Sequence, residues 1–94
     1  MAVSIQDARE WLRIDGTDND AIITGLLAAA PSYIEASTGF TLEKQATDAK
    51  ISTLCDTVTK MLLSLWYKPE QAEAERLQKT IDSLLKLITV LGNG

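Results

Sequence analysis

Residues 51–66, Ile-Ser-Thr-Leu-Cys-Asp-Thr-Val-Thr-Lys-Met-Leu-Leu-Ser-Leu-Trp, carry the most regular apolar pattern in the chain. Apolar side chains recur there at steps of three, one, three, three, one, three and one residues, which is the spacing along one face of an α-helix. A helix of about 20 residues is about 30 Å long, the width of a small domain. We therefore predict a long central helix, with Thr47 or Asp48 as its N-cap and Lys68-Pro69 ending it.

A short helix at about residues 5–13 is predicted before it, because Ser4 and Asp7 have the spacing of a capping box. A second helix is predicted at about residues 19–37, with Gly39 just beyond its C-terminus. Its apolar positions are Ile22, Ile23, Leu26, Leu27, Ala30 and Ile34. Pro31 lacks a backbone donor, and this predicts a kink or a local break near the preceding turn.

The corner between these two helices is rich in aspartate, which raises the question of a metal site. An EF-hand loop that starts at Asp15 fails, because its sixth position should be glycine and is Asp20, and its twelfth should be glutamate and is a leucine. We instead interpret the segment as a helix corner. Gly16 would follow the first helix in a left-handed conformation, and Thr17 or Asp18 would cap the second helix.

The C-terminal part of the chain predicts one more helix. Residues 40–47 are interpreted as a connector, and residues 70–91 favour helix throughout. The apolar positions of this last helix are Ile81, Leu84, Leu85, Ile88 and Leu91. Residues 68–80 have little to bury and are a candidate flexible segment. No strand pattern competes, so the predicted fold is all-α: one domain over residues 1–94, a small bundle of about four helices around the long third helix.

The helical patterns also predict a hydrophobic core. Its expected members are Trp11, Leu12, Ile23, Leu27, Ile34, Leu54, Cys55, Val58, Leu62, Leu65, Trp66, Leu84, Leu85 and Ile88.

Composition argues against most catalytic chemistry. The 94 residues include no histidine, which is the usual general base at neutral pH and the commonest metal ligand. Cys55 is the only thiol, and its place on the apolar stripe favours a buried side chain over a reactive one. No phosphate-binding loop, nucleophile elbow or zinc spacing occurs. We expect no catalytic residues, no cofactor and no metal; an enzyme that uses paired carboxylates is the remaining alternative.

Charge argues against a nucleic-acid binder. The net charge is −4, and residues 1–43 hold seven acids and two arginines, whereas residues 44–94 hold six acids and seven basic groups. This asymmetry suits head-to-tail contact between copies. A helix-turn-helix would need basic groups on its recognition helix, and the second predicted helix has none. No apolar run approaches the roughly 18 residues that span a bilayer, so no membrane contact is expected.

The order of several motifs resembles a known family. A short helix ends in Glu10-Trp11-Leu12-Arg13-Ile14-Asp15-Gly16, and the acidic corner 17–20 leads into a helix that contains Tyr33-Ile34-Glu35. Thr38-Gly39 and later Leu65-Trp66-Tyr67 follow. Together these motifs resemble the head-tail connectors of tailed bacteriophages and prophages, over about two thirds of the chain. Phe40 departs from the basic residue that often follows Thr-Gly in relatives, and residues 70–80 are more helix-prone than the usual loop.

The resemblance implies a structural protein made in the bacterial cytoplasm and incorporated into the virion. Copies would form a ring beneath the portal protein, extend the channel through which DNA passes without sequence-specific binding, and receive the next head-completion or tail protein. The expected subunit interface includes Ala28, Ala29, Tyr33 and Tyr67, with the Ala28-Ala29-Ala30 stretch against the third or fourth helix of a neighbour. The alternative is a small helical adaptor or regulator that binds one host or phage protein.

Overall fold

The computed structural model describes residues 3–67 and 72–93, and every regular element in these ranges is helical. The helices are α1 (Ile5–Leu12), α2 (Asp20–Thr38), α3 (Leu42–Thr47), α4 (Ala49–Tyr67) and α5 (Ala74–Asn93). The predicted all-α class is confirmed. The short α3 corrects the expectation that residues 40–47 are a plain connector.

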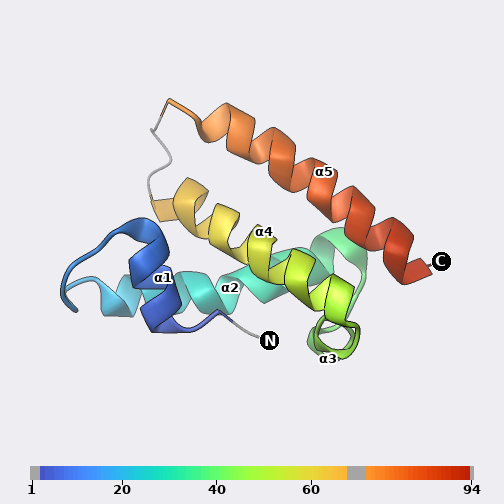
Figure 1. Ribbon diagram of the computed structural model, residues 1–94, viewed down its shortest axis with the longest axis horizontal. Coiled ribbons are helices and arrows are strands. Elements are labelled where there is room, and N and C mark those ends of the chain that lie inside the picture. Colours follow the sequence, from blue (N-terminus) through green and yellow to red (C-terminus); the bar gives the residue numbers. More distant parts are fainter. Residues whose placement is uncertain (1–2, 68–71, 94) are drawn as a thin grey trace.

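Helix α4 packs against each of the other four helices. Figure 1 shows α5 running alongside α4, α2 passing behind it, and α1 lying across one end. α2 and α5 also contact each other. No described helix is both long and apolar enough to cross a membrane.

The capping box at the start of α1 is confirmed, because Ser4 Oγ accepts from the Asp7 N–H at 3.1 Å and Asp7 Oδ2 accepts from the Ser4 N–H at 3.2 Å.

The corner between α1 and α2 differs from the prediction in two ways. α1 ends at Leu12, and its C-cap residue is Arg13 in the left-handed conformation (φ 58°), so Gly16 is not the cap although it too has a positive φ. Asn19 is the N-cap position of α2 and makes no side-chain cap bond, so the expected Thr17 or Asp18 cap is wrong.

Helix α2 continues through Pro31, so the expected local break does not occur. Buried side chains on both sides of the proline, Ile23 and Ile34, fix the helix against its neighbours, and this packing outweighs the lost backbone hydrogen bond. Gly39 ends the helix as predicted, with φ 80° and its N–H bonded to the Glu35 carbonyl at 2.7 Å.

The ends of α4 and α5 follow from local sequence. Asp48 Oδ1 accepts from the backbone N–H groups of Lys50 (2.8 Å) and Ile51 (3.3 Å), so Asp48 is the cap of α4, as predicted. α4 extends to Tyr67, and the expected stop at Lys68-Pro69 falls outside the described residues. Residues 74–80 belong to α5, and residues 68–71 are not described, so the flexibility expected for residues 68–80 stays a prediction.

Two hydrophobic clusters hold the helices together. The larger joins α2, α4 and α5 and has as its buried members Ala30, Ile34, Phe40, Ile51, Cys55, Val58, Leu62, Ile81, Leu85 and Ile88. The smaller lies under α1 and is built on Ala8, Ile23 and Leu63, with Leu12 and Leu27 packed against it. Leu54, Leu65, Trp66 and Leu84 are partly buried at the edge of the larger cluster.

Trp11 is a correction to the expected core. Its side chain is 46% exposed, because it lies over the surface of α4 and not between helices. Its indole N–H donates to Ser64 Oγ at 2.7 Å, and Lys60 Nζ lies 5.8 Å from its ring centroid. Trp11 therefore fastens α1 onto α4 from outside the core.

Candidate functional site

The titratable groups that the sequence singled out are a buried cysteine and an acidic helix corner. Burial raises the pKa of the Cys55 thiol to about 11, and the nearby Asp56 carboxylate adds to this effect. A thiol with this pKa stays protonated at neutral pH and is a weak nucleophile. Among the described residues, no group of three or more cysteines and acids is placed to hold a metal ion.

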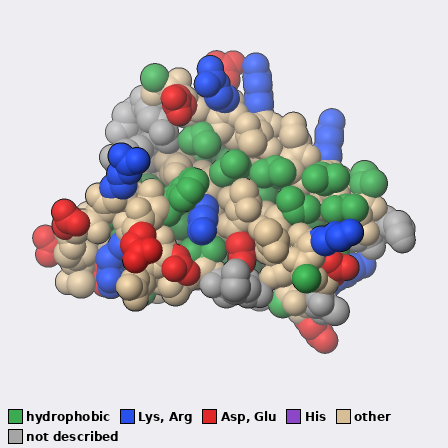
Figure 2. Space-filling model, viewed as in Figure 1, with side chains coloured by type: hydrophobic (Ala, Val, Ile, Leu, Met, Phe, Trp, Pro, Cys, Tyr) green, Lys and Arg blue, Asp and Glu red, His purple; other side chains and the backbone are tan. Residues whose placement is uncertain are grey.

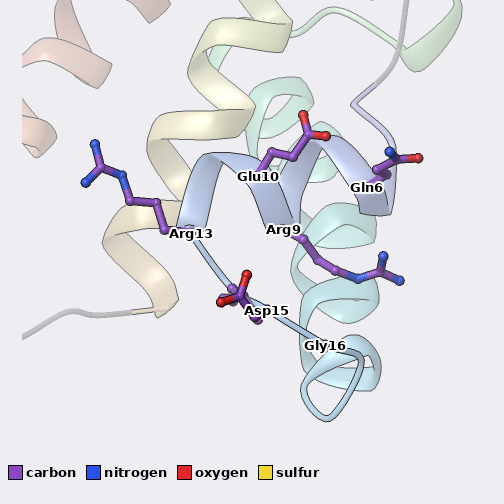
Figure 3. A pocket seen from close by; sticks show the side chains of 7 residues that line it. Gln6, Arg9, Glu10, Arg13, Asp15 and Gly16 are labelled. Carbon is purple, nitrogen blue, oxygen red and sulfur yellow. The ribbon is translucent and has the colours of Figure 1, made fainter.

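A polar hollow of about 560 Å³ lies beside the end of α1. Figure 3 shows Arg9, Glu10 and Arg13 pointing in different directions around it, so their charges do not converge on one point. Arg9 is paired with Asp20 on α2, through Nε to Oδ1 at 2.9 Å and Nη2 to Oδ2 at 2.7 Å. The hydrogen bond from Arg9 lowers the pKa of Asp20. The hollow is thus the outer surface of a fastened helix corner.

The four expected interface residues occupy different environments. Ala28 and Ala29 are exposed on α2. Tyr33 is partly buried and packs edge-to-face on Trp66, with ring centroids 5.7 Å apart. Tyr67 is also partly buried, and its hydroxyl accepts a hydrogen bond from Asn19 Nδ2 at 2.8 Å. The two tyrosines are therefore engaged within the subunit, and the two alanines are the accessible pair.

The alanines belong to an exposed face of α2 composed of small side chains, which we call the α2 face. Its members are Ala21, Gly25, Ala28, Ala29, Ser32 and Ala36, with Ile22 at its margin. Their spacing places them along one side of the helix. Ile22 is 58% exposed and is the large apolar side chain of this surface. Small side chains on this surface allow a second helix to approach closely.

A second apolar surface, which the sequence analysis missed, lies on the C-terminal half of α5. Leu87, Val90 and Leu91 are 44%, 67% and 43% exposed. Figure 2 shows hydrophobic side chains running along α4 and α5 across the viewed side of the molecule. The sequence signal was present, since Leu87 and Val90 fall outside the apolar stripe that points to the core.

This surface continues into a hollow of about 460 Å³ between α5 and the start of α4. Its lining residues are Ala49, Lys50, Thr53, Leu54 and Leu91. We call Leu87, Val90 and Leu91, together with this hollow, the α5 patch. Contiguous exposed apolar surface on a small protein commonly marks an interaction site.

Comparison with known proteins identifies a family that matches this chain. A family model described as phage gp6-like head-tail connector protein matches residues 2–88. The matched range includes the whole of α1 to α4 and most of α5. Searches among curated proteins and among solved structures found no match.

Proposed function

The chain belongs to the phage gp6-like head-tail connector family, and we propose that it is a connector subunit whose copies form a ring beneath the portal protein. The ring extends the channel through which DNA passes and is the platform on which the next head-completion or tail protein docks. The observation that carries this proposal is the match of the family model over residues 2–88.

The surface of the subunit supports an assembly role. A ring of identical subunits requires one patch of each copy to contact a different patch of the next. The α2 face and the α5 patch are two such exposed surfaces on different helices. The expected contact of Ala28, Ala29, Tyr33 and Tyr67 with a neighbouring subunit remains part of the proposal. Tyr33 and Tyr67 also make contacts within the subunit.

The charge of the chain is compatible with a DNA channel. A net charge of −4 gives phosphates little to bind, because affinity for DNA depends on neutralising phosphates with Lys and Arg. DNA would pass through the channel without tight binding and without sequence-specific recognition. Assembly takes place in the host cytoplasm, and the ring remains in the finished virion.

Substitution of the α2 face tests the ring. Ala29→Glu places a charge in the contact and should abolish rings in electron micrographs, while circular dichroism shows unchanged helical content. Thr80→Glu is the control, because Thr80 is exposed on α5 and lies outside the α2 face. Rings formed equally well by both variants would remove the α2 face from the interface.

Loss of the gene tests the role. A phage or prophage without this chain should produce capsids but no tailed, infectious particles, and the wild-type chain supplied in trans should restore them. Normal yields of tailed particles without the chain would contradict a connector role.

A further inference from the structure

We propose that the α5 patch of one subunit receives the α2 face of the next subunit, in a head-to-tail contact. This inference rests on the proposed ring and identifies the two surfaces that close it. The occupant of the α5 patch is thus a second copy of this chain.

The first argument is shape. Leu87 and Val90 project from α5 as exposed side chains, and the α2 face offers gaps between small residues such as Gly25 and Ala29. Large side chains on one helix fit the grooves between small ones on another, which brings the two backbones close together. In return, Ile22 is an exposed apolar side chain that can enter the hollow beside Leu91.

The second argument is charge. Residues 83–93 of α5 contain one charged side chain, Lys86, and Lys50 lines the hollow, so both of these charges beside the α5 patch are positive. Residues 14–43 contain no Lys or Arg. Exposed Asp18 and Glu35 lie toward the two ends of the α2 face. Opposite charges around two apolar surfaces favour their association and set its direction.

The same charges disfavour pairing of like surfaces. Two α5 patches brought together around a two-fold axis would join surfaces that both carry Lys86 and Lys50, and two α2 faces would join surfaces that both carry Asp18 and Glu35. A heterologous contact avoids both arrangements. It also leaves one free surface at each end of a growing oligomer, so association continues until a ring closes.

Two variants that each block one surface test this contact. Ala29→Glu disables the α2 face and Val90→Glu disables the α5 patch, and both side chains are exposed, so folding is preserved. Each variant alone should raise the concentration needed for assembly at least about tenfold, the effect of losing an interface centre. An equimolar mixture should form dimers and stop, because each pair retains one intact contact. Native mass spectrometry measures these species.

One control variant and two contrary outcomes distinguish this contact from its alternatives. Thr80→Glu is exposed on α5 two turns before Leu87 and should assemble like the wild type. The Ala29→Glu variant could still form dimers with itself. If adding Val90→Glu to the same chain prevents these dimers, the contact is α5–α5 and the proposal is overturned. Assembly of Val90→Glu like that of the wild type would leave the α5 patch to another protein and would also overturn it.

The conditions for these assembly measurements are first established with the wild-type chain. Purified portal protein is added if the wild-type chain alone stays monomeric. A wild-type chain that assembles in neither condition contradicts the ring itself. A wild-type chain that assembles while the mixture of variants forms no dimer contradicts only the pairing of these two surfaces.

Discussion

The guanidinium of Arg9 and the carboxylate of Asp20 fasten the corner between α1 and α2. Two hydrogen bonds, at 2.9 and 2.7 Å, join the groups in a bidentate arrangement. Asp20 is the first residue of α2, where a negative charge also interacts favourably with the helix dipole. The corner that first resembled a metal loop is thus a structural ion pair.

This ion pair predicts a pH-dependent stability. Arg9 lowers the pKa of Asp20 in the folded chain, so the unfolded chain binds a proton more readily. The pair therefore stabilises the fold above the ordinary aspartate pKa of about 3.9, and this contribution is lost as pH falls through the lowered folded value. Asp20→Asn should lower the melting temperature at pH 7, and the difference from the wild type should shrink toward pH 2.

Thermal unfolding followed by circular dichroism at both pH values measures this effect. Asp18→Asn, in the exposed loop two residues away, is the control and should change the melting temperature little. A deficit of Asp20→Asn that is equally large at pH 7 and pH 2 would contradict the role of the pair.

Cys55 provides a second prediction at this scale. Burial raises the pKa of its thiol to about 11, so about one molecule in a thousand carries the thiolate at pH 8. A thiol reagent such as Ellman's reagent should label the folded chain at least about 100-fold more slowly than the urea-unfolded chain. Equal labelling rates would show that Cys55 is accessible and activated.

Helix α4 serves two clusters with neighbouring residues. Leu62 is buried in the cluster with α5, and Leu63 is buried in the cluster under α1. The periodic pattern of residues 51–66 predicted one buried face and therefore included Leu62 and not Leu63. A helix surrounded on several sides buries more than one face, and a single periodic stripe does not contain this information.

The other helix ends show which local features the sequence could predict. The capping box at Ser4, the stop at Gly39 and the cap at Asp48 were predictable, because each depends on side chains within a few residues.

The short α3 had a local signal that the sequence analysis missed, because Thr41 is its N-cap and Thr41 Oγ1 accepts from the Lys44 N–H at 3.2 Å. The hydrogen bond from Gln45 Nε2 to the Pro31 carbonyl at 3.2 Å is tertiary and was not predictable. The hollow of the α5 patch likewise depends on how α4 and α5 pack.

Leu63→Ala tests whether α4 packs into two separate hydrophobic clusters. Truncation of this fully buried side chain should lower the free energy of unfolding by about 2–5 kcal/mol. Hydrogen exchange should increase first in α1, which the smaller cluster holds. Leu62→Ala, the matched variant, should increase exchange first in α5. An identical exchange pattern in both variants would contradict the assignment of two clusters.

Pro31→Ala tests the strain in α2. Alanine supplies an N–H for the Leu27 carbonyl and has a higher helix propensity by about 3 kcal/mol, partly offset by greater freedom of the unfolded chain. We expect the free energy of unfolding to rise by about 1–2 kcal/mol, measured by urea unfolding. A lower stability would show that the proline is favourable where it is.

At the scale of the whole molecule, the two halves of the sequence differ in charge and present different surfaces. The acidic part contains the α2 face, and the α5 patch has lysines beside it. Composition indicated this asymmetry, and the sequence motifs indicated the family, which the family model supports over residues 2–88. Leu87 and Val90 fall outside the core-facing stripe of α5, so the sequence carried a signal for the second surface, whereas the hollow beside Leu91 depends on how α4 and α5 pack.

The most direct test of the account is native mass spectrometry of the wild-type chain, alone and with purified portal protein. The account predicts closed oligomers of well over two subunits, each a whole multiple of the 10.3 kDa chain and uniform in copy number. Oligomers that never grow beyond a two-fold dimer, or subunits that remain monomeric in both conditions, would contradict it.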